Sequence, residues 1–181
     1  MRATVQTVVA VALFVSQSLP SFADGREHIV RLPWKGHAQV ASKIVPPGHP
    51  QHDARCGTDV EAIISGAGLM TLLGQFFAEQ SHCLRSDFSF YSGRFTFTSP
   101  DGRTVGGQYF GQLVPALLPP PSTPPLGSGL IRGNVCVEGG TVFPRILNDC
   151  AAGRYSSATG ILNLDTGDGT VFIDYQIGVG R

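Results

Sequence analysis

The amino-acid sequence predicts an all-β fold, a closed antiparallel barrel of about eight strands. The chain has 181 residues, among them 23 glycines and 13 prolines, which is typical of many short strands joined by tight turns. Valine, isoleucine, leucine and phenylalanine are interleaved with the glycines, so the composition is not that of a disordered chain. Beyond the first 23 residues the only candidate helix is 62–77. It contains Gly66, Gly68 and Gly74, and each glycine disfavours a helix by about 1 kcal/mol.

Turn signals divide the chain into its strands. Ser99-Pro100-Asp101-Gly102 predicts a turn in which proline presets φ and glycine takes the left-handed position, and 165–169 predicts a second turn. The expected strands are 34–45, 60–73, 75–84, 88–98, 104–114, 130–137, 155–164 and 170–179.

The fourth strand changes phase along its length. Phe88 and Phe90 share one face, whereas Phe95 and Phe97 are displaced by one residue, which predicts a β-bulge at Ser92-Gly93. The proline-rich stretch 115–129 is expected to be an extended surface loop, and 141–152 resembles an insertion.

Antiparallel strands without helices must protect their edges. Closure into a barrel achieves this, and a barrel of about eight strands encloses packed side chains or one small ligand. A sandwich of two sheets is the alternative, because the number of strands does not separate the two architectures.

The N-terminus predicts export. Arg2, the apolar run 5–15 and the small residues of Ser21-Phe22-Ala23 are the three parts of a cleavable signal peptide. The apolar run is shorter than the roughly 20 residues of a membrane span. We therefore expect a signal peptide at 1–23, an N-terminal arm with the first strand at 24–55 and a β-barrel domain at 56–181, with a secreted or periplasmic location and no membrane span after cleavage.

Charge and motifs exclude several function classes. Removing Arg2 from the 13 lysines and arginines leaves 12, against 13 acidic residues, a net charge of about −1, which gives no support to a nucleic-acid partner. The sequence has no phosphate loop, no Gly-x-Ser-x-Gly elbow and no His-Glu-x-x-His. No cofactor and no metal are therefore expected. His49, His52 and Cys56 could be read as metal ligands, but a solvated arm is the preferred interpretation.

A series of motifs resembles a known family. The motifs are Gly66-x-Gly-x-x-Thr71-x-x-Gly74-Gln75-Phe76, Gly93-x-Phe95-Thr96-Phe97, Gly106-x-x-Tyr109-x-Gly111, Gly139-Gly140-Thr141 and Gly153-Arg154-Tyr155-x-x-Ala158-Thr159-Gly160. In this order they resemble the barrel superfamily of allene oxide cyclases and dirigent proteins, a calycin-like fold, and most closely its small secreted bacterial members. The resemblance implies a barrel with a hydrophobic cavity and is compatible with a homo-oligomer.

The resemblance has two departures. Residues 142–152 interrupt the family's Gly-Gly-Thr-Gly-Arg-Phe signature, and Leu72 stands where many bacterial relatives have histidine. The catalytic residues of the plant cyclases cannot be transferred, because their local motifs are absent here.

The four cysteines predict two disulfides in an exported chain. Cys136 and Cys150 flank the stretch that interrupts the family signature, where a staple would offset the entropy of closing the loop. Cys56 precedes the second strand and Cys83 ends the third, so an antiparallel pair would bring them together. We therefore expect Cys56–Cys83 and Cys136–Cys150 among the three pairings that four cysteines allow.

Three residues are weak catalytic candidates: Glu79, His82 and Tyr109. Glu79 and His82 lie three apart on one strand, so their side chains point to opposite faces unless a bulge intervenes. A buried Glu79 would have a raised pKa and could act as acid or base, but a surface position is preferred. The sequence does not decide which face lines the lumen, because neither is clearly more apolar.

Three functions follow. The first is an exported barrel that binds a small hydrophobic molecule in its lumen. The second is a cyclase or isomerase whose cavity guides a reactive intermediate. The third is a structural or surface-interaction protein with a packed barrel. An open lumen of a few hundred Å³ with one or two buried polar groups would favour the first two functions, and a lumen filled with phenylalanine and leucine the third.

Overall fold

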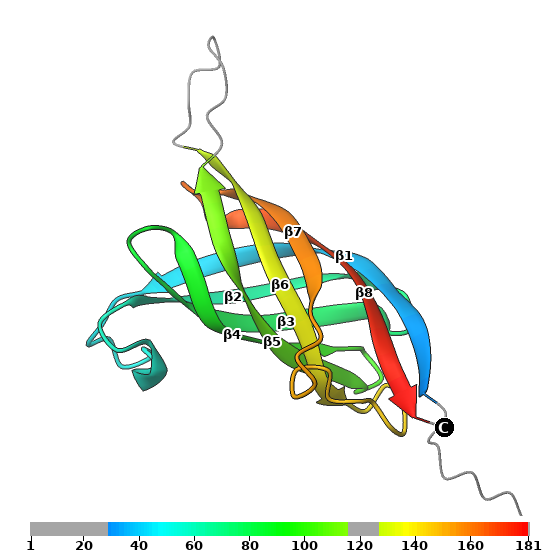
Figure 1. Ribbon diagram of the computed structural model, residues 1–181. Coiled ribbons are helices and arrows are strands. Elements are labelled where there is room, and N and C mark those ends of the chain that lie inside the picture. Colours follow the sequence, from blue (N-terminus) through cyan, green and yellow to red (C-terminus); the bar gives the residue numbers. More distant parts are fainter. Residues whose placement is uncertain (1–28, 116–126, 181) are drawn as a thin grey trace, which may run out of the picture.

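The computed structural model describes residues 29–115 and 127–180. The predicted signal peptide and most of the proline-rich stretch lie outside these residues. In the described ranges the protein is an eight-stranded antiparallel barrel in which each strand pairs with the next and the last pairs with the first (Figure 1). The prediction of a closed barrel is confirmed, and the sandwich is not formed.

The strands follow one another up and down around the barrel. They are β1 Ile29–Val45, β2 Val60–Met70, β3 Gly74–Leu84, β4 Ser89–Thr98, β5 Thr104–Pro115, β6 Ser128–Gly140, β7 Ser156–Asn163 and β8 Asp168–Gly180. A single turn of 3-10 helix, Ala54–Cys56, lies between β1 and β2. None of the helical structure within 29–115 and 127–180 is long and apolar enough to span a membrane.

Closure of the barrel depends on β1. It pairs with β8 from Ile29 opposite Gly180 to Ala41 opposite Asp168, and with β2 along its other edge. β1 begins at Ile29, five residues before the predicted start. The first strand, which the sequence analysis placed together with the N-terminal arm, therefore closes the barrel.

The turns and the bulge occur where the sequence predicts them. The register between β4 and β5 shifts between Phe90 and Gly93, and Ser92 takes a φ of 51°. β2 ends at Met70, earlier than the predicted strand 60–73, because the chain turns at Thr71–Leu73. Gly74 then has a φ of 74°, the left-handed region that glycine occupies without strain. The bulge returns Phe90, Phe95 and Phe97 to the same inner face.

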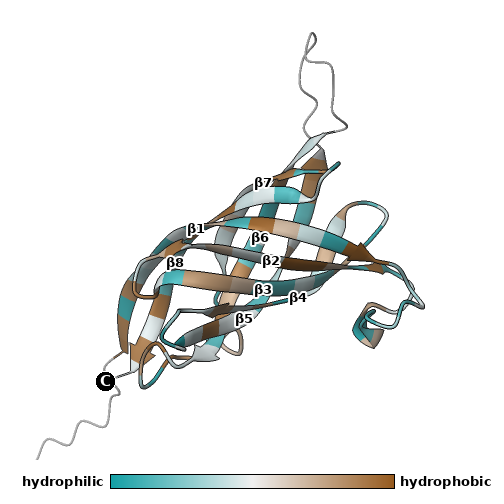
Figure 2. Cartoon of the chain, turned by 180° about the vertical axis from the view of Figure 1, so that it is seen from behind, coloured by the Kyte–Doolittle hydropathy of each residue, from teal (hydrophilic) through white to brown (hydrophobic). Residues whose placement is uncertain are grey.

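The barrel has two ends, which we name by their contents. At the packed end β1, β3, β5 and β7 begin, and at the cavity end they finish. Hydrophobic and hydrophilic residues alternate along the strands in Figure 2, as expected when one face of each strand lines the lumen.

Both predicted disulfides are present, one at each end. Cys56–Cys83 has a Cα–Cα distance of 5.1 Å and Cys136–Cys150 one of 5.0 Å. Cys83 lies at the cavity end of β3 and holds the loop between β1 and β2 against the barrel. Cys136 lies on β6 toward the packed end and holds the insertion-like stretch.

Candidate functional site

The packed end is filled by aromatic rings. Trp34 lies with its ring centroid 6.2 Å from that of Phe95, 5.9 Å from that of Phe97 and 5.9 Å from that of Tyr175. Phe76 adds a further ring 4.7 Å from Phe97. The indole Nε1 of Trp34 is buried and has no hydrogen-bond partner within the described ranges. These rings form a buried cluster that fills the lumen at this end.

A buried polar cluster covers the packed end. Asp149 is 1 % exposed and accepts hydrogen bonds from Arg31 at 2.7 and 2.9 Å and from the Tyr175 hydroxyl at 2.8 Å. Burial and the hydrogen bond to the Asp149 carboxylate raise the pKa of Tyr175. Val142 and Ile146, from the insertion-like stretch, pack against the core. This stretch therefore closes one end of the barrel.

The other half of the lumen contains a cavity of about 100 Å³. Its lining is predominantly apolar, and Ile44, which contributes to it, is 52 % exposed, so the cavity reaches solvent at the cavity end. The lining residues are Val40, Ser42, Ile44, Ala62, Ile64, Gln80, His82, Leu84, Phe90, Phe95, Phe97, Tyr109, Leu113, Ile131, Gly133, Asn134, Val135, Ala158, Leu162, Val171 and Ile173. The volume is smaller than the few hundred Å³ that would favour a binding or enzymatic barrel, and the filled half of the lumen has the character of the packed alternative.

Two glycines allow aromatic rings to lie against the barrel wall. A Cβ atom on Gly93 would lie 2.5 Å from the Tyr109 carbonyl oxygen and 2.9 Å from two of its ring carbons. A Cβ atom on Gly107 would lie 2.9 Å from the ring of Phe95. A larger residue at either position would collide with the ring and with a backbone carbonyl oxygen, which is that of Cys136 in the case of Gly107, so the two glycines allow the rings to lie where they do.

His82 and Tyr109 form a polar pair in this cavity. The His82 Nδ1 atom lies 2.9 Å from the Tyr109 hydroxyl oxygen, and the two rings meet edge to face with centroids 5.6 Å apart. The His82 ring also stacks on Phe90 at 4.8 Å. β3 contributes His82 and β5 contributes Tyr109, with β4 between them, so the two side chains reach each other across the lumen side of the bulged strand.

Burial keeps both members of the pair neutral. Desolvation, together with the smaller effect of the positive charge of Arg55, lowers the pKa of His82 to about 4. Desolvation also raises the pKa of Tyr109 far above its usual value. At neutral pH the pair is an uncharged imidazole beside an uncharged phenol.

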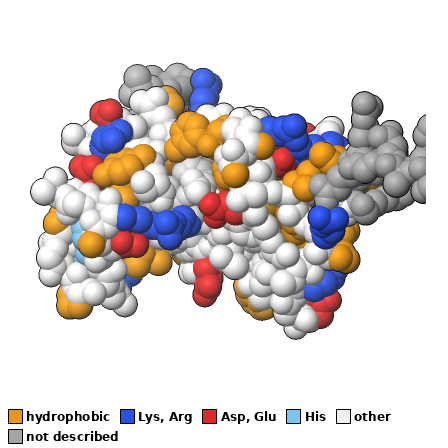
Figure 3. Space-filling model, turned by 60° about the horizontal axis from the view of Figure 1, so that its bottom comes forward, with side chains coloured by type: hydrophobic (Ala, Val, Ile, Leu, Met, Phe, Trp, Pro, Cys, Tyr) orange, Lys and Arg blue, Asp and Glu red, His pale blue; other side chains and the backbone are white. Residues whose placement is uncertain are grey.

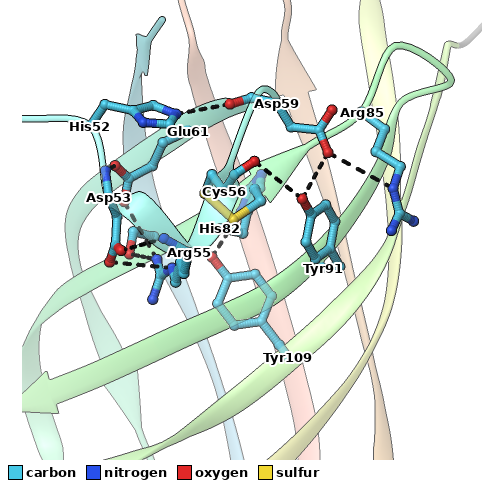
Figure 4. The surroundings of a disulfide bond; sticks show 12 residues. His52, Asp53, Arg55, Cys56, Asp59, Glu61, His82, Arg85, Tyr91 and Tyr109 are labelled. Carbon is cyan, nitrogen blue, oxygen red and sulfur yellow. Dashed lines mark hydrogen bonds and ion pairs between the residues drawn. A yellow bond between two sulfur atoms is a disulfide. The ribbon is translucent and has the colours of Figure 1, made fainter. Parts of the chain in front are cut away.

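The wall behind the pair is held by a second polar network (Figure 4). Arg55 forms an ion pair with Glu61 at 3.4 Å and donates to the Ser81 hydroxyl, and Glu61, which is 4 % exposed, accepts from the Asp53 amide at 2.8 Å. The disulfide Cys56–Cys83 joins the same loop to the residue after His82. The loop before β2 is mostly exposed to solvent, as the preferred interpretation expects, but the disulfide and the ion pair fix it to the outer wall.

The remaining candidates lie elsewhere. Glu79 is exposed on the outer face of β3, as preferred, and so faces away from His82. His49 accepts from the Gln51 amide, His52 lies 2.8 Å from the Asp59 carbonyl oxygen, and Cys56 is in a disulfide. The residues of 29–115 and 127–180 contain no group of three metal-ligating side chains.

The sequence pointed to His82 and Tyr109 separately but not to their contact. Their separation of 27 residues carries no signal, because the contact depends on the register of three strands. Asp149 and Arg31 were missed altogether, since the two residues are 118 positions apart.

The chain was compared with protein-family models, with curated proteins and with solved structures, and none of the three comparisons found a match.

Proposed function

We propose that the protein binds a small, predominantly apolar molecule in the half of the lumen next to the cavity end. The observation that supports this most strongly is a cavity with an apolar lining that contains one neutral polar pair, His82 and Tyr109. Apolar pockets with a few placed polar groups are the common form of small-molecule sites. Membership of the allene oxide cyclase and dirigent superfamily stays a prediction from the sequence motifs.

The size of the cavity restricts the ligand. An engineered apolar cavity of about 150 Å³ in another protein binds benzene, so a cavity of about 100 Å³ encloses only part of a six-membered ring. The cavity also reaches solvent beside Ile44, so a longer ligand can extend outward. The part of the ligand held inside is therefore small.

Binding is tested by titrating the isotope-labelled protein with methylenecyclohexane and following methyl resonances by NMR. We expect the methyl groups of Ile64 and Leu113, which line the cavity, to shift. Those of Ile177, at the packed end, should stay in place. Equal or absent shifts at all three residues would contradict the proposal.

A matched pair of variants separates the cavity from the surface. Ala158 lines the cavity, whereas Ala67 is exposed on the outer face of β2. Ala158→Leu should fill the cavity and abolish the shifts, and Ala67→Leu should leave them unchanged. The same result from both variants would show that the probe binds somewhere else.

We also propose that the protein is exported and that cleavage occurs before Asp24. Two disulfides support this, because such bonds form and persist in oxidising compartments. N-terminal sequencing of the protein recovered outside the cytoplasm should begin at Asp24. Recovery of the chain with Met1 in the cytoplasm would overturn the proposal.

A further inference from the structure

The polar groups of the cavity are few and carry no formal charge. Among the lining residues whose side chains face inward, Ser42, Gln80, His82 and Tyr109 are polar, and none of the lining residues is Asp, Glu, Lys or Arg. Placing an ion in such a site costs several kcal/mol unless a counter-charge accompanies it. A neutral ligand is therefore favoured over a carboxylate or an amine.

The hydrogen bond between the pair decides where the proton lies. A buried phenol hydroxyl needs an acceptor, and the partner that the structure gives Tyr109 is His82 Nδ1 at 2.9 Å. If Tyr109 donates to Nδ1, the neutral imidazole carries its own proton on Nε2. No hydrogen bond from Nε2 is found in the described ranges, so this N–H is available as a donor.

The other polar side chains of the cavity do not select an acceptor on the ligand in the same way. The Ser42 hydroxyl donates to the Gly167 carbonyl at 3.1 Å. The Gln80 amide both donates and accepts, so it does not distinguish one ligand from another. Arg55, outside the wall, places positive charge near the pair. Glu61 and Asp53 pair with that guanidinium at 3.4 and 3.5 Å, so the positive charge is largely balanced outside the cavity.

We propose that the ligand carries a neutral carbonyl oxygen, as in a ketone, aldehyde or ester, that accepts a hydrogen bond from His82 Nε2–H while Tyr109 fixes the imidazole tautomer. This inference rests on the proposed function, since it specifies the chemistry of a ligand in the same cavity. His82 is a specificity-determining residue and Tyr109 a positioning residue that acts through it.

The affinity test uses the full chain and four probes built on one ring. Cyclohexanone and methylenecyclohexane have almost the same shape and differ in C=O against C=CH₂, and cyclohexanecarboxylate and cyclohexylamine carry opposite charges. We expect cyclohexanone to bind about fivefold more tightly than methylenecyclohexane, the change that one net hydrogen bond produces, and both charged probes to bind more weakly than either. Equal affinity of the two neutral probes, or tighter binding of the carboxylate, would overturn the inference.

Failure of the inference is distinguishable from failure of the proposed function. If methylenecyclohexane binds and cyclohexanone gains nothing, the cavity binds apolar molecules but His82 does not select a carbonyl. If neither neutral probe binds, the proposed function itself is wrong and the inference falls with it.

Two variants test which side chain is responsible for the preference for the carbonyl probe. His82→Phe keeps a ring of similar size and removes the donor, so the fivefold preference should disappear while methylenecyclohexane still binds. Tyr109→Phe removes the hydroxyl that fixes the tautomer and should reduce the preference without abolishing it. A preference unchanged in both variants would contradict the assigned roles.

The tautomer is observed directly by ¹⁵N NMR of the imidazole nitrogens, with His82→Phe used to assign the His82 signals. We expect the protonated nitrogen to be Nε2 in the wild type at neutral pH. In Tyr109→Phe the signals should move toward a mixture of the two tautomers. A proton on Nδ1 in the wild type would overturn the inference regardless of the affinities.

Discussion

The two ends of the barrel use the same strands but are filled differently. At the packed end Trp34, Phe76 and Phe97 fill the lumen, and Asp149 from the insertion-like stretch is buried against them. At the cavity end the inward residues are smaller or lie flat against the wall, and His82 and Tyr109 are the polar pair that faces the remaining space. The difference indicates that the packed end contributes more to stability, and the cavity end is the one for which we propose ligand binding.

The largest expected effect compares two isoleucines. Ile177 is completely buried at the packed end, whereas Ile64 lines the cavity and is half-buried. We expect Ile177→Ala to lower the free energy of unfolding by about 4 kcal/mol, within the range for buried residues, and Ile64→Ala to lower it by about 1.5 kcal/mol, since its neighbours are already missing on one side. Urea unfolding of both variants measures the two losses. Equal losses would remove the distinction between the ends.

The two disulfides extend the comparison. The chain-entropy model gives about 3.5 kcal/mol for Cys56–Cys83 and about 3 kcal/mol for Cys136–Cys150, because the first closes 27 residues and the second 14. Replacing each pair by alanine should lower stability by about these amounts. Loss of Cys56–Cys83 should also weaken binding of methylenecyclohexane, since Cys83 adjoins His82, and loss of Cys136–Cys150 should not. A binding defect in the second variant alone would reverse the assignment of the ends.

The buried ion pair between Arg31 and Asp149 provides a further test of the packed end. Asp149→Ala leaves Arg31 and the Tyr175 hydroxyl without their acceptor, and we expect a loss of about 3 kcal/mol, the lower end of the range, since Arg31 is partly exposed. The matched control is Asp174→Ala, which removes an exposed pair with Lys35 and should cost less than about 1 kcal/mol. Thermal unfolding of the two variants measures the two losses of stability. Equal losses would contradict the larger contribution of the buried pair.

The smallest expected effect is a pH dependence of the stability, which arises from His82 at the cavity end. The folded-state pKa of His82 is about 4, below its ordinary value of 6.5, so between these values the unfolded chain binds more protons. Stability is therefore fully present above pH 6.5 and is lost as the pH falls toward 4. Between pH 7.5 and pH 4.5 this group should remove about 2.5 kcal/mol.

The control for the pH effect is His82→Phe, which lacks the titrating group. Unfolding of the wild type and of the variant at pH 7.5 and pH 4.5 gives the loss of stability between these pH values for each protein. An identical pH dependence in the two proteins would show that folding leaves the pKa of His82 at its ordinary value.

The fold could be predicted because its signals are local. The turn at 99–102, the bulge at Ser92-Gly93 and the period of two along β8 each involve neighbouring residues, and each is observed. The disulfides were also predictable, since antiparallel pairing of β2 with β3 places Glu61 opposite Cys83 and so brings Cys56 close to it.

The inner face was not predictable from hydrophobicity. Phe77 is 61 % exposed and Leu69 is 53 % exposed on the outside, whereas Gln80 and His82 face the lumen. Figure 3 shows hydrophobic side chains in several separate groups between charged ones on the face that it draws. The inner face is set by barrel closure, which places rings beside glycines of neighbouring strands, and this information is spread over residues far apart in the sequence.

Trp34 gives the protein an optical reporter of its own. It is the single tryptophan of the chain, it is 1 % exposed among aromatic rings, and its Nε1 has no hydrogen-bond partner in the described ranges. An indole in such surroundings emits at short wavelength and shifts to the red when water reaches it. Emission from Trp34 therefore follows the opening of the packed end, and a ligand bound near His82 will be detected mainly as a higher unfolding midpoint.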